Sequence, residues 1–482
     1  MRRVKLYDTL SREVRLFVPL HPPKVGLFVC GLTPYAEAHI GHAKAFVTFD
    51  VLARALRHWG YRVFYLQNVT NLDDRLIERG AAEGVDPLVL AERHFAEYRR
   101  AMDELAVRSV NYYPFATDYV PEIVRQIGSL IERKMAYESD GSVYFDVGKF
   151  PSYGALSGQR TEALRPGARV EVDPRKRSPE DFVIWKAATP GEPTWESPWG
   201  PGRPGWHIED TAITVQLLGA RYDIHGGGLD LKFPHHEAEI ALAESATGEA
   251  PFVSVWMHAG LLTFGGEKMS KSLGNVVSLS ATIEKFGPMP LRFFFLNAHY
   301  RSPLDFIEGK SLEESQEAYA RLEGPYRRLT ERLSAAPEEP EGEPLDEATA
   351  RSASETVEAL EDLLADDFNT REAIARLFTW GRSVNDTLSA HPTLQREALE
   401  SLAAPYRWAE EVLGLFEDLR GAGAMTALDG VVRSALDARR RARARGDYAE
   451  ADRIRAELLA AGVQLEDSGP TTTWRLASEG SG

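Results

Sequence analysis

The fold is decided by residues 25–67, which read VGLFVCGLTPYAEAHIGHAKAFVTFDVLARALRHWGYRVFYLQ. Val25 to Cys30 predict a buried strand, and Gly31 to Tyr35 predict a turn. From His42 onward apolar residues recur at helical spacing until a glycine ends the run, and Tyr61 to Gln67 predict the next strand. This strand–turn–helix–strand unit is typical of a parallel, doubly wound α/β domain that binds a nucleotide.

The bulk properties are those of a water-soluble protein with several domains. The chain has 482 residues, of which 43% are hydrophobic and 27% charged, and its formal net charge is -16. No apolar stretch is long enough for a membrane helix, and no apolar run follows the basic N-terminus. The single cysteine, Cys30, excludes an intramolecular disulfide. We expect a cytoplasmic protein without a coat of nucleic acid, although the net charge leaves room for a local basic groove.

The sequence beyond the first unit indicates an interrupted nucleotide-binding fold. A helix is predicted from Leu88 to Val107, and residues 113–200 carry short strands interrupted by Gly, Pro and Arg. We interpret that region as an insertion. Strands predicted at Tyr222 to His225 and at Phe252 to Met257 then supply the second half of the fold.

The C-terminal third is predicted to be mostly helical. A helical pattern runs from Ser311 to Leu333, and a Pro/Glu-rich linker at residues 335–344 marks the clearest domain boundary. Helical pattern then continues to about Leu419. A Gly/Ala stretch at residues 421–424 leads to a small terminal module.

Two short motifs are chemically suited to hold a triphosphate. His39 and His42 lie where the first helix begins, and Gly41 between them permits close approach of a backbone or a base. A helix N-terminus offers backbone N–H groups and a partial positive charge, to which two imidazoles can add donors. Two surface histidines at a helix start are the alternative interpretation.

The second motif lies about half the chain later. Lys268 and Lys271 bracket two serines on a loop flanked by glycines, and mobile lysines of this kind can close over a pyrophosphate. The alternative is a solvated basic loop. Gly226 and Gly227, which follow His225 at a strand end, would let adenine or ribose lie against the backbone, although a glycine loop alone more often marks only a turn.

A metal site is suggested, but not specified, by the residue types. His235 and Glu239 are four residues apart and share one face of a helix, and Cys30 ends the first strand. A cysteine, a histidine and carboxylates such as Asp210 suit zinc. A lone cysteine is more often an inert buried thiol, so spacing alone leaves this site open.

The chain resembles the cysteinyl-tRNA synthetases, which are class I aminoacyl-tRNA synthetases, over nearly its whole length. The resemblance rests on ordered matches at 29–31, 39–42, 68–74, 204–209, 223–228, 233–239, 256–258, 268–275, 366–370 and 469–475. It implies a Rossmann-like α/β catalytic domain with an inserted subdomain, a helical bundle and a small C-terminal anticodon-binding module. The expected limits are a catalytic domain at 1–310 with its insertion at about 113–200, a helical stem at 311–335, a linker at 336–346, a bundle at 347–420 and the anticodon module at 425–482.

In that family two cysteines, a histidine and a glutamate hold a zinc ion that also binds the substrate thiol. The matching positions here are Cys30, Asp210, His235 and Glu239, so Asp210 replaces the second cysteine. A carboxylate brings the same negative charge as a thiolate, and its reach makes the exchange plausible. We therefore expect one zinc ion per chain, bound less tightly; the alternative is that Asp210 caps or pairs locally and the site is poor in metal.

The resemblance also assigns the substrate pocket and the reaction. Thr70, Trp206 and Asp230 would line the amino-acid pocket, with Asp230 pairing with the substrate ammonium and Trp206 forming a flat wall. L-Cysteine would attack the α-phosphate of ATP, which is expected with Mg²⁺, to give cysteinyl-adenylate, and tRNA(Cys) would accept the cysteinyl group. His39, His42, Lys268 and Lys271 are the expected phosphate-binding and catalytic residues.

RNA contact is expected in the tail, and we expect a monomer. Five arginines between Arg439 and Arg445 lie on a predicted helix, where they suit an RNA backbone or form a solvated face. Trp474 and Arg475 would stack on an anticodon base, unless Trp474 packs in the module's own core.

Two rival functions are compatible with part of the sequence. A ligase that attaches cysteine to an amino sugar would share the catalytic half, but the helical and tail modules argue against it. A non-catalytic RNA-binding descendant is opposed by the intact histidine and lysine motifs.

Overall fold

The computed structural model describes residues 1–159, 173–268, 276–337, 341–417, 447–468 and 471–476, with isolated positions between 419 and 442. It divides into two compact units, Met1–Leu415 and Phe416–Gly482. Within the described residues, no helix combines the length and apolar character that crossing a membrane requires.

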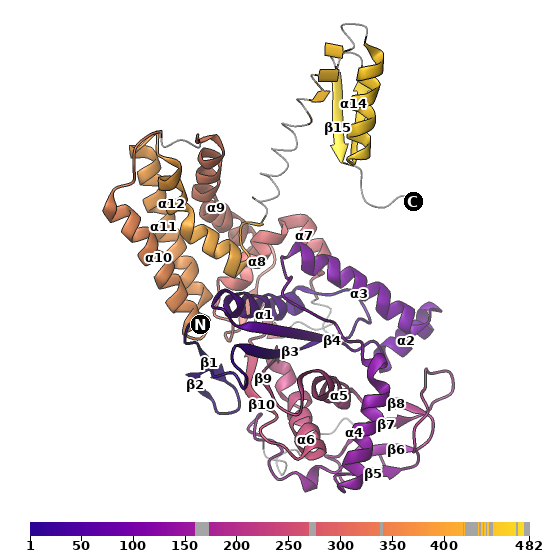
Figure 1. The fold of residues 1–482 in the computed structure, drawn as a ribbon. Coiled ribbons are helices and arrows are strands. Elements are labelled where there is room, and N and C mark those ends of the chain that lie inside the picture. Colours follow the sequence, from indigo (N-terminus) through magenta and orange to yellow (C-terminus); the bar gives the residue numbers. More distant parts are fainter. Residues whose placement is uncertain are drawn as a thin grey trace. The chain divides into compact units, whose positions relative to one another are not determined.

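A four-stranded parallel sheet forms the centre of the first unit, in the order β10-β9-β3-β4. Its strands are β3 (Lys24–Leu32), β4 (Arg62–Val69), β9 (Tyr222–Gly228) and β10 (Val253–Ala259). Helix α1 (Ile40–His58) lies on one side of this sheet, and α5 (Trp206–Leu218) and α6 (His235–Thr247) lie on the other (Figure 1). The predicted doubly wound α/β architecture is confirmed.

The order of the strands locates the ligand crevice. The chain leaves β3 through α1 and returns as β4 on one side, whereas β9 pairs with β3 on the other side. In open α/β sheets ligands bind at such a switch point, outside the carboxyl ends of the strands. Cys30 of β3 and His225 of β9 lie at this edge, since Phe28 pairs with His225 and Val29 with Gly226.

The first strand is longer than the sequence predicts. Gly31 and Leu32 were expected in a turn, but both belong to β3. Leu32 pairs with Val69 of β4, and the Gly31 N–H donates to Oδ1 of Asn68 at 2.6 Å. A Cβ at Gly31 would lie 1.7 Å from the Asn68 carbonyl oxygen, so only glycine fits here.

The insertion is a second, antiparallel sheet in the order β5-β6-β7-β8. Its strands are β5 (Ala136–Ser139), β6 (Ser142–Phe145), β7 (Phe182–Ala187) and β8 (Gly202–Pro204). Two smaller strand groups complete the first unit: the hairpin of β1 (Lys5–Asp8) and β2 (Glu13–Leu16), and the sheet of β11 (Leu262–Phe264), β12 (Glu267–Lys268) and β13 (Leu304–Phe306).

The remaining helices surround the sheet or form the helical region after it. Around the sheet lie α2 (Asp74–Glu83), α3 (Pro87–Glu104), α4 (Val120–Glu132), α7 (Leu279–Phe286) and α8 (Pro288–Leu296). The helical region consists of α9 (Ser311–Ala335), α10 (Glu347–Ala365), α11 (Thr370–Ala390) and α12 (Arg396–Trp408). In the second unit, α14 (Tyr448–Ala460) accompanies the hairpin of β14 (Val463–Ser468) and β15 (Thr471–Leu476).

Candidate functional site

A cleft of about 670 Å³ opens at the carboxyl edge of the parallel sheet. His39, Gly41 and His42 line one part of it, and Cys30 and Trp206 line another. Its other lining residues are Gly31, Leu32, Thr33, Tyr35, Ala45, Phe46, Arg75, Gly228, Asp230, Leu231, Ala259, Gly260, Leu261 and Leu262. One cavity therefore joins the expected phosphate motif to the expected metal site, and its volume suits a small-molecule substrate pair.

The two histidines of the first motif sit at the N-terminus of α1. His39 is the N-cap residue, and its ring stacks on that of His42 with centroids 3.7 Å apart. The His39 N–H donates to Nδ1 of His42 at 3.4 Å. A Cβ at Gly41 would lie 3.0 Å from the His39 ring, so glycine gives that ring its place over the first turn. Both imidazoles and the helix N-terminus thus border the same cleft.

The second motif falls largely outside the described residues. Lys268 ends β12, and its backbone pairs with Thr263 of β11. Lys271 and the serines beside it lie outside the residues that the structure describes. The phosphate contacts of both lysines remain predictions.

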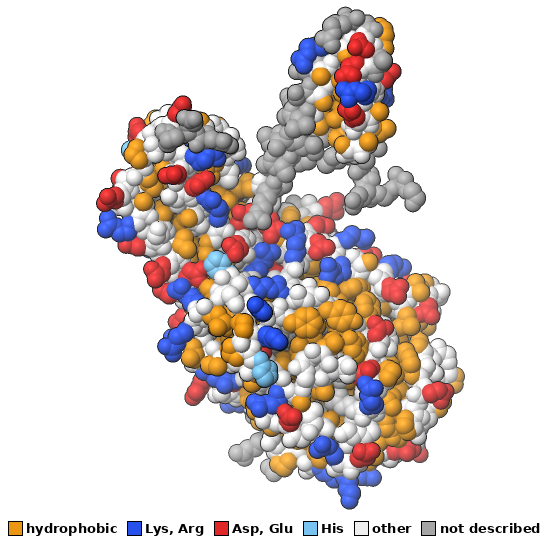
Figure 2. Space-filling model, viewed as in Figure 1, with side chains coloured by type: hydrophobic (Ala, Val, Ile, Leu, Met, Phe, Trp, Pro, Cys, Tyr) orange, Lys and Arg blue, Asp and Glu red, His pale blue; other side chains and the backbone are white. Residues whose placement is uncertain are grey.

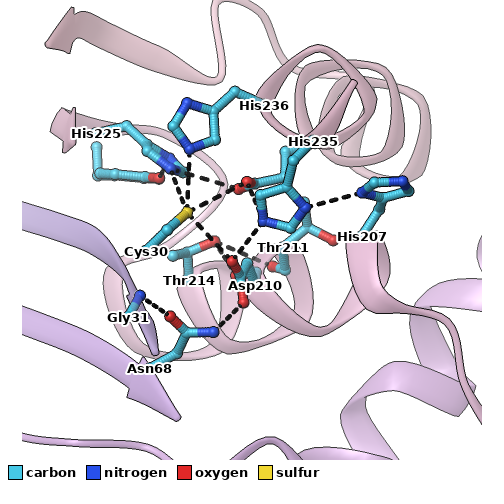
Figure 3. Close-up of polar contacts among 12 residues, drawn as sticks. Cys30, Gly31, Asn68, His207, Asp210, Thr211, Thr214, His225, His235 and His236 are labelled. Atoms are coloured by element: carbon cyan, nitrogen blue, oxygen red, sulfur yellow. Dashed lines mark hydrogen bonds and ion pairs between the residues drawn. The ribbon is translucent and has the colours of Figure 1, made fainter. Parts of the chain in front are cut away.

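Four buried side chains, those of Cys30, Asp210, His235 and Glu239, converge behind the cleft. Figure 3 labels Cys30, Asp210 and His235 among them. The Cys30 Sγ lies 3.3 Å from Oδ2 of Asp210 and 3.6 Å from Oε1 of Glu239. Nε2 of His235 lies 3.0 Å from the same Asp210 oxygen and 3.1 Å from Oε1 of Glu239. The four-residue spacing of His235 and Glu239 on α6 produces the shared face that it predicted. Candidate ligand atoms of all four residues lie within 4.8 Å of one another.

Two further histidines, which the sequence analysis did not include, reach the same thiol. Nε2 of His225 lies 3.3 Å and Nε2 of His236 lies 3.1 Å from the Cys30 Sγ. Nδ1 of His225 lies 2.6 Å from the Tyr222 hydroxyl, and Nδ1 of His236 lies 2.8 Å from Nε2 of His258. These histidines, with Cys30 and Glu239, form a second group whose atoms lie within metal-binding range.

Burial controls the charge of this cluster. Burial raises the pKa of the Cys30 thiol, and the Glu239 and Asp210 carboxylates raise it further. Burial, and then the charge of Asp210, also raises the pKa of Glu239. Burial lowers the pKa of His225 and His236 well below the ordinary value, so their rings are neutral at pH 7 and able to act as ligands. Without a cation, burial therefore favours the neutral forms of the thiol and of Glu239, and a bound divalent ion would favour the deprotonated forms that can act as ligands.

The donor set fits a divalent metal ion. Oε2 of the fully buried Glu239 has no hydrogen-bond partner among the described residues. Nitrogen, sulfur and carboxylate donors in a buried group are the ligands of zinc. Surrounding contacts orient them as a metal site requires: Asn68 Nδ2 donates to Oδ1 of Asp210, and Nδ1 of His235 lies 2.8 Å from Nδ1 of His207.

The remaining predicted substrate residues lie at different depths. Trp206 is 43% exposed, borders the cleft and stacks on His235 with ring centroids 4.2 Å apart. Asp230 also borders the cleft. Thr70 is buried just beyond β4, where its hydroxyl accepts a hydrogen bond from Nδ2 of Asn68 at 3.4 Å. Arg75, which the sequence analysis overlooked, lines the cleft with its guanidinium 5.3 Å from the centroid of the Tyr35 ring.

Gly226 and Gly227 lie within β9, and the structure gives each a packing reason. A Cβ at Gly226 would lie 2.3 Å from the Phe49 ring, and one at Gly227 would lie 2.8 Å from the His236 ring. Gly228, one residue further, borders the cleft. Contact of Gly226 and Gly227 with ATP stays a prediction.

In the tail, Arg439 and Arg441 are helical and the other predicted arginines, Arg440, Arg443 and Arg445, lie outside the described residues. The backbones of Trp474 and Arg475 belong to β15, but their side chains are outside the description. The anticodon contacts expected of these residues remain predictions.

Three protein-family descriptions match most of the chain. Residues 16–317 match the class I (C) tRNA synthetase catalytic domain, residues 359–417 match the DALR domain, and residues 425–475 match the cysteinyl-tRNA ligase anticodon-binding domain. The matches follow the order of the catalytic and C-terminal modules.

Individual relatives match over their full length. The chain is 43% identical to the cysteine–tRNA ligase of Pelotomaculum thermopropionicum and 44% identical to that of Methylococcus capsulatus, covering 98% of this chain and 99% of each relative. The methionyl-tRNA synthetase of Mycobacterium tuberculosis superposes with a TM-score of 0.63 at 16% identity, covering 81% of this chain and 92% of that one. The last comparison concerns the fold alone.

Proposed function

Because the chain belongs to the cysteine–tRNA ligase family, it charges tRNA with cysteine, and we propose that it does so through a cysteinyl-adenylate whose thiol is recognised at a zinc site. The observation that carries the proposal is the single cleft, which His39 and His42 border in one part and Cys30 and Trp206 in another.

The activation step requires positioning and charge stabilisation more than covalent help from the protein. The cysteine carboxylate attacks the α-phosphate of ATP, and pyrophosphate leaves. His39, His42 and the N–H groups at the start of α1 donate to phosphate oxygens as negative charge develops. Lys268 and Lys271 are proposed to neutralise the pyrophosphate, on the strength of their family motif. A ribose hydroxyl of the terminal tRNA adenosine then attacks the adenylate carbonyl and releases AMP.

The amino-acid end of the cleft is proposed to hold cysteine by charge and shape. The Asp230 carboxylate pairs with the substrate ammonium, and the exposed Trp206 ring forms a flat wall. Thr70, buried just beyond the end of β4, is proposed to act with Asn68 in shaping the floor of this pocket.

Cys30, Asp210, His235 and Glu239 would hold one zinc ion per chain. When bound, the ion supplies a site for the substrate thiolate, which serine, with a much less acidic hydroxyl, cannot match. The stack of Trp206 on His235 connects these ligands to the cleft. His225 and His236 contact the Cys30 thiol and are proposed to fix its position. Tyr222 orients the ring of His225, and His258 orients that of His236.

The tRNA partner is supported by the matched C-terminal modules. The net charge of the chain is -16, but the charges are unevenly spread. In Figure 2, which has the same view as Figure 1, Lys and Arg side chains gather over the region where Figure 1 labels α1, beside an apolar area. This local basic character suits an RNA backbone. Cytoplasmic action, a monomeric state and the domain limits given above remain our expectations.

Cysteine-dependent ATP–pyrophosphate exchange, with the zinc content of the same sample, tests the proposal. We expect exchange with cysteine and about one zinc ion per chain. Exchange without zinc would keep the ligase activity and overturn the proposed recognition of the thiol. A folded, zinc-loaded protein that gives no exchange would contradict the activation step and favour a binding role.

Replacing Asp210 with cysteine introduces the donor that the family resemblance implies at this position. We expect Asp210→Cys to retain exchange activity and to bind zinc at least as tightly, because the ligand charge is unchanged and a thiolate is the softer donor. Asp210→Asn is the matched control, since it keeps the shape but removes the charge, and it should lose zinc. Competition with a graded series of chelators measures the zinc affinity of each variant. Equal zinc retention by the wild type and Asp210→Asn would contradict the role of Asp210 as a ligand.

A further inference from the structure

Lys44 is a buried cation two residues after His42, and the proposed chemistry does not use it. Its side chain is 2% exposed on α1. The ammonium donates to the backbone carbonyl of Gly260 and, at 2.9 Å, to that of Ser302. Both acceptors come from segments more than 200 residues away, with sequence separations of 216 and 258.

The Gly260 carbonyl belongs to the wall of the cleft that faces α1, and the Ser302 carbonyl lies next to Gly260. Gly260 connects β10 to β11 and lines the cleft together with Ala259, Leu261 and Leu262. Ser302 precedes β13, which pairs with β11. A Cβ at Gly260 would lie 2.4 Å from the Ser302 carbonyl oxygen, so the two segments touch where the lysine reaches them.

A second tether joins this half of the molecule to the same helix. The Ile40 N–H donates to the Val277 carbonyl at 3.2 Å, and the Leu279 N–H donates to the Ala38 carbonyl at 3.1 Å. The start of α1 is therefore fixed to the segment before α7, and its second turn is fixed through Lys44 to the segment after β10. The Ile40 and Leu279 contacts join backbone to backbone, whereas the Lys44 contact is made by a charged side chain.

We infer that Lys44 is a positioning residue that sets the distance between the two walls of the nucleotide part of the cleft. The histidines of α1 border one wall and residues 259–262 form the other, and the ammonium joins them. The inference rests on the proposed function, since the ligand whose binding it controls is ATP.

The cost of burying the ammonium supports this interpretation. Burial lowers the pKa of Lys44 to about 8, so the group remains mainly charged at pH 7. A buried charge is unfavourable unless hydrogen bonds compensate it, and an apolar side chain of similar length would fill the space without that cost. What lysine adds is two oriented hydrogen bonds to two backbone segments.

Replacing Lys44 with methionine tests the inference, because methionine keeps the bulk and removes the donors. In ATP–pyrophosphate exchange we expect kcat/KM for ATP to fall by ~10–100-fold, as for a misplacement of about 1 Å, while the KM for cysteine stays within about twofold. Titration calorimetry with ATP alone should show weaker binding. Equal losses for both substrates, or unchanged ATP binding, would overturn the inference.

Arg57 supplies a matched control on the same helix. Its guanidinium also donates to two backbone carbonyls, those of Val63 and Ser109, away from the cleft. Arg57→Met should lower the melting temperature without a selective effect on ATP. A selective ATP defect in Arg57→Met would overturn the inference, since any loosening of α1 would then suffice.

Lys44→Gln is the second variant should the methionine variant fail to fold. Its amide ends one atom short of the Lys44 Nζ, so the same selective ATP defect is expected, and a defect shared equally with cysteine would overturn the inference. Absence of exchange in the wild type would refute the proposed function instead, and the calorimetric comparison of ATP binding would still decide the role of Lys44.

Discussion

Removal of the Cys30 thiol is expected to abolish the preference for cysteine. We expect Cys30→Ala to lower the ratio of kcat/KM for cysteine over serine by more than ~100-fold, because changes even to groups that only support metal ligands cost 10–100-fold. The zinc content should fall in the same sample. The measurement is ATP–pyrophosphate exchange with each amino acid, accompanied by metal analysis.

The surroundings of Cys30 make this variant interpretable. The thiol is a small buried group between β3 and α6, and alanine fits its space without a new clash. The thiol is only a weak hydrogen-bond partner of Asp210 and Glu239, so the stability of the metal-free protein should change little when it is removed. Cys30→Ser replaces the thiol with a hydroxyl, which is a poor zinc ligand, so this variant should resemble the alanine variant. Equal cysteine-to-serine ratios in the wild type and Cys30→Ala would refute the recognition of the thiol at this site.

The parts of the fold that the sequence predicts well are those specified by local pattern. The helical spacing of apolar residues after His42 corresponds to α1, and the flanking apolar runs correspond to β3 and β4. The error at Gly31 and Leu32 has a non-local cause. Their extended conformation depends on pairing with Val69 and on the side chain of Asn68, neither of which local turn propensity contains.

The candidate metal group could be only half predicted from spacing. The interval between His235 and Glu239 places both on one helical face, but Cys30 and Asp210 are 180 residues apart and meet only through the topology of the sheet. Family resemblance supplied that pairing. The contacts of His225 and His236 with the thiol were not predicted. The glycines after His225 are typical of a nucleotide-binding loop, and that interpretation placed no metal ligand there.

Lys44 illustrates a limit of a different kind. Within the sequence it is one lysine on an otherwise amphipathic helix, where a solvated position would be the normal expectation. Its acceptors are backbone carbonyls, which every residue possesses and which therefore leave no mark in the sequence. Only the folded arrangement of α1 against the segments after β10 and before β13 reveals the contact.

At the other part of the cleft, His42→Ala is expected to lower kcat for cysteine-dependent exchange by ~100–1000-fold, the typical cost of losing one donor to a developing negative charge. Nδ1 of His42 accepts the His39 N–H, so in the neutral ring the proton lies on Nε2, which is then a donor. Because a transition-state contact is removed, the KM for ATP should change much less than kcat.

The geometry of α1 separates this effect from a loss of structure. His42 lies in the first turn of α1. The backbone hydrogen bonds that fix this end of the helix, Ile40 to Val277 and Leu279 to Ala38, do not involve the His42 side chain, so the alanine variant should keep them. His58 at the other end of α1 is the matched control, since its ring bonds to Glu361 and Glu411 instead of bordering the cleft. His58→Ala should lower the melting temperature and leave kcat unchanged, because it loosens the packing of α1 without touching the phosphate end. A His42→Ala variant that raised only the KM for ATP would show that the imidazole binds the ground state as strongly as the transition state. Stabilisation of the transition state of adenylyl transfer would then have to come from the helix N-terminus and the lysine motif.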